Sequence, residues 1–125
     1  MATRKLRTMS DTPPTALAMY GTLRPGEPNH WVVRSIAGTW TEGTIRGWAF
    51  DVTWGAAAGC PGLVLDPEGP LVEVSVLRSD RLPSHLQEID DFEGPGYRRV
   101  ETDVALTDGT VITAAVYEAI QDNVD

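Results

Sequence analysis

The chain has 125 residues, the usual length of one domain and too short for two independent hydrophobic cores. Its 10 basic and 18 acidic residues give a net charge of −8, which argues against binding to the phosphate backbone of nucleic acids. The single cysteine, Cys60, excludes an internal disulfide, and two histidines without a Cys/His cluster exclude a zinc site of standard spacing.

Other classes of protein are excluded by what the sequence lacks. No apolar stretch is long enough for a membrane span or a secretory signal, so we expect a cytoplasmic protein without a membrane partner. The only lysine is Lys5, close to the start of the chain, which argues against Schiff-base chemistry and a P-loop. Residues 1–13 have no hydrophobic period and are expected to be a disordered leader, and residues 14–125 a single domain.

The first expected element is a short apolar strand over residues 16–19. Directly after it comes the segment Tyr20-Gly21-Thr22-Leu23-Arg24-Pro25-Gly26, which is typical of a strand followed by an exposed backbone loop and a turn. Such a loop can offer its amide N–H groups to a bound anion.

The following segments predict further strands. Residues 36–52 combine tryptophans and isoleucines with three glycines, which predicts short strands with tight corners, as in a small barrel. Residues 71–77 and 100–106 alternate between apolar and polar side chains. Asp108-Gly109 separates the second of these runs from residues 110–119, so we expect a β-hairpin near the end of the chain.

One helix is expected from about Ser79 to Phe92, with Ser79 or Asp80 as the N-cap and Gly94 as the stop. At about 100° per residue, one face of this helix is apolar and carries Leu82, Leu86 and Ile89. Glu93 lies within this apolar face and Asp90 borders it, whereas Glu88 and Asp91 point away.

Glu93 is therefore the candidate acid/base. Burial disfavours the charged form of a carboxyl group, so its pKa should rise toward the range where the group can both accept and donate a proton. The alternative is an ordinary glutamate at the end of a helix that turns outward into solvent, because Gly94 and Pro95 follow at once.

The loop Tyr20-Gly21-Thr22-Leu23, taken together with Ile89-Asp90-Asp91-Phe92-Glu93-Gly94, resembles the gamma-glutamylcyclotransferase-like family, in its AIG2-like and gamma-glutamylamine cyclotransferase branch. The resemblance implies an α+β fold, a small and mostly antiparallel β-barrel with one principal helix. It also implies a reaction without a cofactor, in which a small gamma-glutamyl amine or amide is cyclised to 5-oxoproline and a free amine is released.

In that family the glutamate corresponding to Glu93 is the general acid/base, and the loop corresponding to Tyr20, Gly21, Thr22 and Leu23 lines the pocket for the gamma-glutamyl group. Whether the loop holds the α-carboxylate or the developing oxyanion stays open. Tyr97 matches a tyrosine of the family's pattern and is a candidate pocket residue, with an ordinary half-buried strand tyrosine as the alternative. Tyr117, on the last expected strand, is a candidate of the same kind.

Other residues concern the identity of the substrate or the support of the loop rather than the proton transfer. The segment around Cys60 and Pro61 departs from the family's usual pattern and is expected near the acceptor side of the pocket, which leaves the leaving amine unidentified. His30 is expected to brace the loop, and Arg24 to be solvated. The alternative to an enzyme is a non-catalytic module that binds a small ligand in the same pocket, since a fold and a pocket do not prove turnover.

Overall fold

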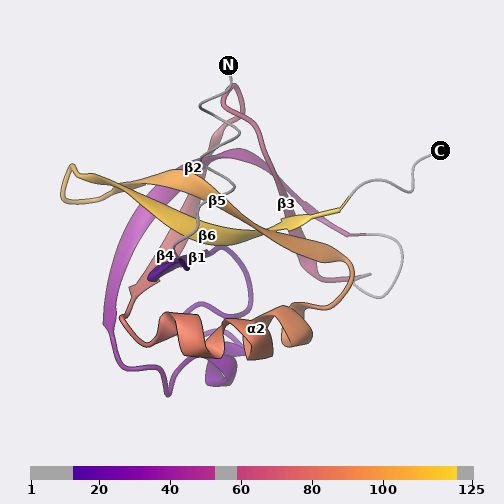
Figure 1. Cartoon of the computed structure of the whole chain (residues 1–125). Coiled ribbons are helices and arrows are strands. Elements are labelled where there is room, and N and C mark those ends of the chain that lie inside the picture. The colour runs from indigo at the N-terminus through magenta and orange to yellow at the C-terminus, as the bar shows by residue number, and fades with distance from the viewer. Residues whose placement is uncertain (1–12, 53–58, 121–125) are drawn as a thin grey trace.

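The computed structural model describes residues 13–52 and 59–120, so the expected leader lies outside the described residues except for Pro13. The described chain forms six strands and three helical segments (Figure 1). In chain order these are β1 (Ala16–Met19), the 3-10 helix η1 (His30–Val32), β2 (Thr39–Asp51), β3 (Pro61–Leu65), β4 (Leu71–Arg78), the 3-10 helix η2 (Leu82–His85), α2 (Leu86–Glu93), β5 (Tyr97–Leu106) and β6 (Val111–Ala119).

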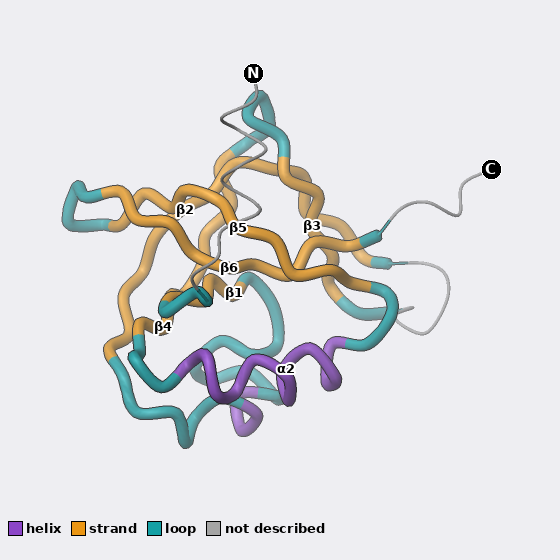
Figure 2. Tube along the Cα trace, in the orientation of Figure 1, coloured by secondary structure: helices purple, strands orange, loops and turns teal. Residues whose placement is uncertain are grey.

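The strands form one sheet that closes on itself. Their order is β3-β2-β4-β1-β6-β5, and a further pairing between β2 and β5 joins the two sides. All pairings are antiparallel except that of β1 with β6. Figure 2 shows the strands curving around one another with α2 below them. The expected α+β barrel with one principal helix is confirmed.

Strand β2 corrects one prediction, because residues 36–52 do not form short strands with corners. Thirteen residues form one continuous strand, whose first part pairs with β4 and whose last part pairs with β3. Its glycines allow the neighbouring strands to lie close to it. A Cβ atom on Gly43 would lie 2.8 Å from the carbonyl oxygen of Ala105, and one on Gly47 would lie 2.6 Å from that of Val64.

The expected hairpin is confirmed as β5 and β6, which pair antiparallel over nine residue pairs. Gly109 has φ +95°, a left-handed conformation that glycine adopts without steric strain. The strand expected over residues 71–77 is β4, and the strand expected over residues 16–19 is β1. The Asp108-Gly109 turn predicted the hairpin, the alternation of apolar and polar side chains predicted β4, and a short apolar stretch predicted β1.

The helix begins later than expected. The chain enters it through η2, in which Pro83 occupies the first turn, and regular α-helix starts only at Leu86. Ser79 is not the N-cap; its hydroxyl accepts a hydrogen bond from the N–H of Arg81 at 3.0 Å. Gly94, with φ +80°, ends the helix as predicted.

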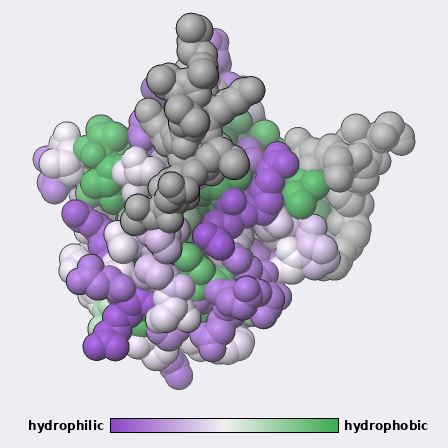
Figure 3. Space-filling model, in the orientation of Figure 1, coloured by the Kyte–Doolittle hydropathy of each residue, from purple (hydrophilic) through white to green (hydrophobic). Residues whose placement is uncertain are grey.

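The core consists of two main clusters on the two sides of β1, all four residues of which are buried. One fills the barrel and includes Val76, Val104 and Val116. The other lies between the barrel and the helical side, where the predicted apolar face of the helix is buried through Leu82, Leu86 and Ile89. Hydrophilic residues cover much of the visible face in Figure 3. The second cluster fixes α2 against the barrel and so positions Glu93.

Candidate functional site

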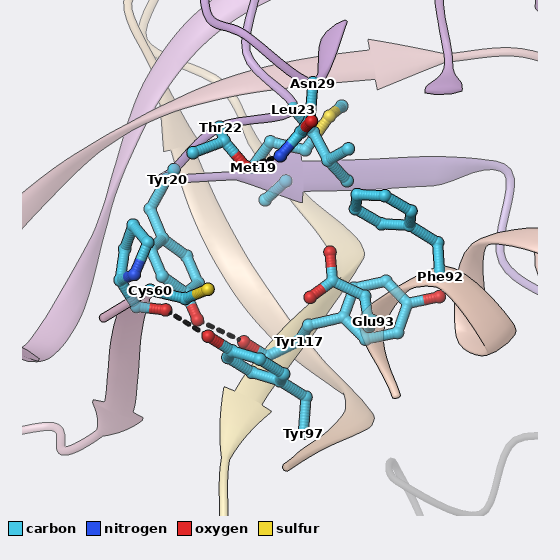
Figure 4. A pocket seen from close by; sticks show the side chains of 13 residues that line it. Met19, Tyr20, Thr22, Leu23, Asn29, Cys60, Phe92, Glu93, Tyr97 and Tyr117 are labelled. Carbon is cyan, nitrogen blue, oxygen red and sulfur yellow. Dashed lines mark hydrogen bonds between the residues drawn. The ribbon is translucent and has the colours of Figure 1, made fainter. Parts of the chain in front are cut away.

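A pocket of about 180 Å³ opens where the end of β1, the loop after it, the end of α2 and the β5–β6 hairpin meet. Figure 4 shows the side chains that surround it. The lining residues are Ala18, Met19, Tyr20, Gly21, Thr22, Leu23, Asn29, Cys60, Pro61, Phe92, Glu93, Tyr97 and Tyr117. All seven candidate site residues of the sequence analysis therefore lie around one space.

The loop after β1 is held in place by residues that follow it in the chain. The main-chain N–H of Asn29 donates to the carbonyl of Thr22 at 2.9 Å, and its side-chain amide donates to the Thr22 hydroxyl at 3.0 Å. His30 Nδ1 lies 2.9 Å from the carbonyl oxygen of Leu23, so this histidine braces the loop as expected. A Cβ atom on Gly21 would lie 3.1 Å from the ring of Pro61, which explains glycine there.

These contacts leave main-chain donors of the loop unused. In the part of the chain that the structure describes, the N–H groups of Gly21, Thr22 and Leu23 make no hydrogen bond. Of the described residues, those that line the pocket include no Lys, Arg or His. A ligand anion in this pocket would therefore meet neutral donors rather than a cationic side chain.

Glu93 is the last residue of α2, and its carboxyl group points into the space between the labelled side chains of Figure 4. Its side chain does not turn outward into solvent, which was the alternative considered from the sequence. Burial raises the pKa of this carboxyl group from 4.5 to about 7. Near neutral pH the group is divided between its acid and its base form, as an acid/base catalyst requires.

Three tyrosines form much of the pocket wall, and the hydroxyl group of each is bonded to the protein. Tyr20 donates to the main-chain carbonyl of Tyr117 at 2.7 Å, and Tyr97 to that of Pro61 at 2.5 Å. Tyr117 in turn donates to the carboxylate of Asp90 at 2.6 Å. The tyrosines thus contribute shape to the pocket while their hydroxyl groups are held by the scaffold.

Burial also raises the pKa values of these tyrosines, with the charge of Glu93 as a smaller cause in each case. The pKa of Tyr97 rises to about 12, and those of Tyr20 and Tyr117 lie above the ordinary value of 10 as well. All three phenols are therefore neutral near pH 7, which leaves Glu93 as the pocket carboxyl group with a pKa in the neutral range.

An ion pair behind the pocket ties the helix to the hairpin. The Arg99 guanidinium donates two hydrogen bonds to the Asp90 carboxylate, from Nε at 2.8 Å and from Nη2 at 3.0 Å. The hydrogen bonds from Arg99 hold the pKa of Asp90 below its ordinary value. Because Asp90 precedes Glu93 by one helical turn, this contact and the one to Tyr117 fix the end of α2 on β5 and β6.

Six lining residues were not identified as site residues from the sequence, and two of them, Ala18 and Met19, belong to the strand β1. Asn29 lies next to His30 in a segment that was expected only to brace the loop, and Phe92 is part of the same motif as Glu93. The segment around Cys60 and Pro61 was expected near the acceptor side of the pocket because it departs from the family's pattern, and both residues line the pocket.

The arginines near these motifs do not line the pocket. Arg24 is bonded to the hydroxyl of Ser75 at 3.1 Å and pairs with Glu42 at 3.4 Å, so the expectation that it is simply solvated was wrong. Arg98 pairs with Glu118, on the side of β5 opposite to Arg99. This agrees with the alternation of side chains along a strand.

Within residues 13–52 and 59–120, no group of three or more His, Cys, Asp or Glu side chains is arranged to hold a metal ion. None of the helices in these ranges is long and apolar enough to cross a membrane.

The sequence matches the model of the family described as gamma-glutamyl cyclotransferase, AIG2-like, over residues 17–125. The chain is also similar to the solved structure of YkqA from Bacillus subtilis, with 27% identity and a TM-score of 0.66, covering 85% of this chain and 36% of that one. It therefore spans little more than a third of that relative. None of the curated proteins matches the chain.

Two further solved structures have a similar fold over most of their own length. An uncharacterized protein from Pyrococcus horikoshii is 26% identical, with a TM-score of 0.58, over 84% of this chain and 77% of that one. An AIG2-like protein from Mus musculus is 24% identical, with a TM-score of 0.63, over 86% of this chain and 78% of that one.

Proposed function

Because the chain belongs to the AIG2-like gamma-glutamyl cyclotransferase family, we propose that it releases 5-oxoproline and a free amine from a small gamma-glutamyl amine or amide, with Glu93 as the general acid/base. One observation carries this proposal above the others. Glu93 is a half-buried carboxyl group whose pKa lies at about 7, and its carboxylate points into the pocket that the family's loop segment also lines (Figure 4).

The first step is the transfer of a proton from the substrate's α-ammonium group to Glu93. The freed amine nitrogen then attacks the γ-carbonyl carbon, and the new C–N bond closes a five-membered ring. Because nucleophile and carbonyl belong to the same molecule, the attack has the entropic advantage of an intramolecular reaction. The protein has only to hold the substrate in a folded conformation and to move protons.

In the second step the C–N bond to the leaving amine breaks, and Glu93 passes a proton to the departing nitrogen. Over the whole reaction two protons leave the α-nitrogen and two reach the leaving nitrogen, which departs as an ammonium ion. A carboxyl group with a pKa at about 7 serves both transfers, since neither its acid nor its base form is rare near neutral pH.

The loop after β1 supplies the neutral donors for the substrate's negative charge. Gly21, Thr22 and Leu23 line the pocket, and within the described chain their N–H groups have no protein acceptor. They are suited to hold either the α-carboxylate or the oxyanion that develops on the γ-carbonyl oxygen. With the tyrosine hydroxyls bonded to the scaffold, the rings of Tyr20 and Tyr97 act as walls that keep water away from the reacting atoms.

The experiment that tests the proposal is 5-oxoproline release from a panel of gamma-glutamyl amines, amides and dipeptides, with the native protein and with Glu93→Gln. Turnover by the native protein and its loss in the variant would support the enzyme. The alternative is a module that binds the same small ligands without converting them. It predicts no turnover by either protein but calorimetrically measurable binding by both.

A further inference from the structure

Two large aromatic side chains lie exposed beside the pocket. Phe92 lines the pocket and is 39% exposed, and Trp31, in η1, is 58% exposed. Their rings pack edge to face, with centroids 6.0 Å apart and planes at 83°. Neither ring belongs to the core clusters of the described chain, so core packing does not explain the pair.

Each of the two aromatic residues is next to a residue of the site in the sequence. Phe92 directly precedes Glu93 at the end of α2. Trp31 follows Asn29 and His30, which hold the loop after β1 through Thr22 and Leu23. The aromatic pair therefore extends the pocket wall from the carboxyl group of Glu93 outward to the surface.

The size of the pocket requires part of the substrate to lie outside it. A cavity of about 180 Å³ is smaller than the ~300–1,000 Å³ of sites that enclose a drug-sized ligand. It holds a small acyl group, and a larger substituent on the leaving nitrogen must extend beyond the rim. Phe92 lines the same pocket as Glu93, so a substituent on the nitrogen that Glu93 protonates can leave the pocket along the Phe92 ring.

We propose that Trp31 and Phe92 form the subsite for the substituent of the leaving amine and make the protein prefer amines with an aromatic or extended hydrocarbon group. This inference rests on the proposed cyclotransferase function. Edge-to-face and stacked contacts with such a group stabilise the complex beyond simple burial of apolar surface.

The test compares two substrates that differ only at the proposed subsite, gamma-glutamyl benzylamide and gamma-glutamyl methylamide. The ratio of their kcat/KM values is measured for the native chain, Trp31→Ala, Trp31→Phe and Trp48→Ala. Trp48 is a matched control, because it is 54% exposed like Trp31, but its indole N–H donates to Asp66 at 2.9 Å, whereas Trp31 packs against the pocket residue Phe92.

We expect Trp31→Ala to lower the preference for the benzylamide about tenfold, mainly through KM. The free energy of one aromatic contact of this kind corresponds to about a tenfold change in a binding constant. Trp31→Phe should restore most of the preference, and Trp48→Ala should keep the native ratio. An unchanged ratio in Trp31→Ala, or an equal loss in Trp48→Ala, would overturn the subsite.

If the protein is not a cyclotransferase, the native chain converts neither amide. Calorimetric binding of the same two amides then tests the subsite. Weaker binding of the benzylamide alone by Trp31→Ala supports the aromatic subsite in a binding module. Equal binding of both amides by the native chain and the variant refutes it.

Discussion

Replacing Glu93 with glutamine should change how the stability of the protein depends on pH. Burial raises the pKa of Glu93 from 4.5 to about 7, so the folded chain holds this proton more tightly than the unfolded chain does. The free energy of unfolding of the native protein should therefore fall as pH rises through this window. At about 1.4 kcal/mol per pH unit, the loss is at most about 3 kcal/mol.

Glutamine is neutral at every pH and keeps nearly the same shape, so the variant lacks this contribution. Other carboxyl groups titrate in both proteins and cancel in the difference. We expect Glu93→Gln to gain stability relative to the native protein by up to about 3 kcal/mol between about pH 4.5 and about pH 8. Urea denaturation followed by tryptophan fluorescence at several pH values measures this difference.

The kinetic counterpart is an acid limb in the native protein's kcat/KM profile with a midpoint at about pH 7, because the base form of Glu93 accepts the first proton. A stability difference that stays constant across the whole pH range would refute the reasoning. It would mean that the carboxyl group titrates in the folded protein as it does in water.

Three further changes test the surroundings of the site. Asp90→Ala breaks the pair with Arg99 and leaves the Tyr117 hydroxyl without its acceptor, so thermal or urea denaturation should show a loss of about 2 kcal/mol, and kcat should fall more than KM changes. Tyr97→Phe removes a hydroxyl bonded to the main chain and should reduce stability by about 1 kcal/mol while turnover persists; a loss of all turnover would contradict a wall role. Gly43→Ala brings a Cβ within 2.8 Å of a β5 carbonyl oxygen and should destabilise the barrel by more than about 1 kcal/mol, which an unchanged denaturation midpoint would disprove.

The elements that could be predicted from the sequence are those that local patterns specify. The β5–β6 hairpin follows from alternation on both sides of Asp108-Gly109, and the end of α2 follows from Gly94. Strand β2 was predicted wrongly because a glycine looks the same in a turn and at a close approach between strands. Only the neighbouring β3, β4 and β5 reveal that Gly43 and Gly47 lie in one continuous strand.

The sequence by itself determined the family and the loop after β1, and it predicted Glu93 as the candidate acid/base, because residue type and spacing along the chain are sufficient for a motif. The helical period predicted that Glu93 faces the core, but only the tertiary structure decided between this and a glutamate turned into solvent. Only the tertiary structure also showed that the Tyr97 hydroxyl is bonded to Pro61 and that Trp31 packs against Phe92. Hydrogen-bond partners and ring contacts join atoms from segments far apart in the chain, and they form only when the barrel closes and α2 packs against it.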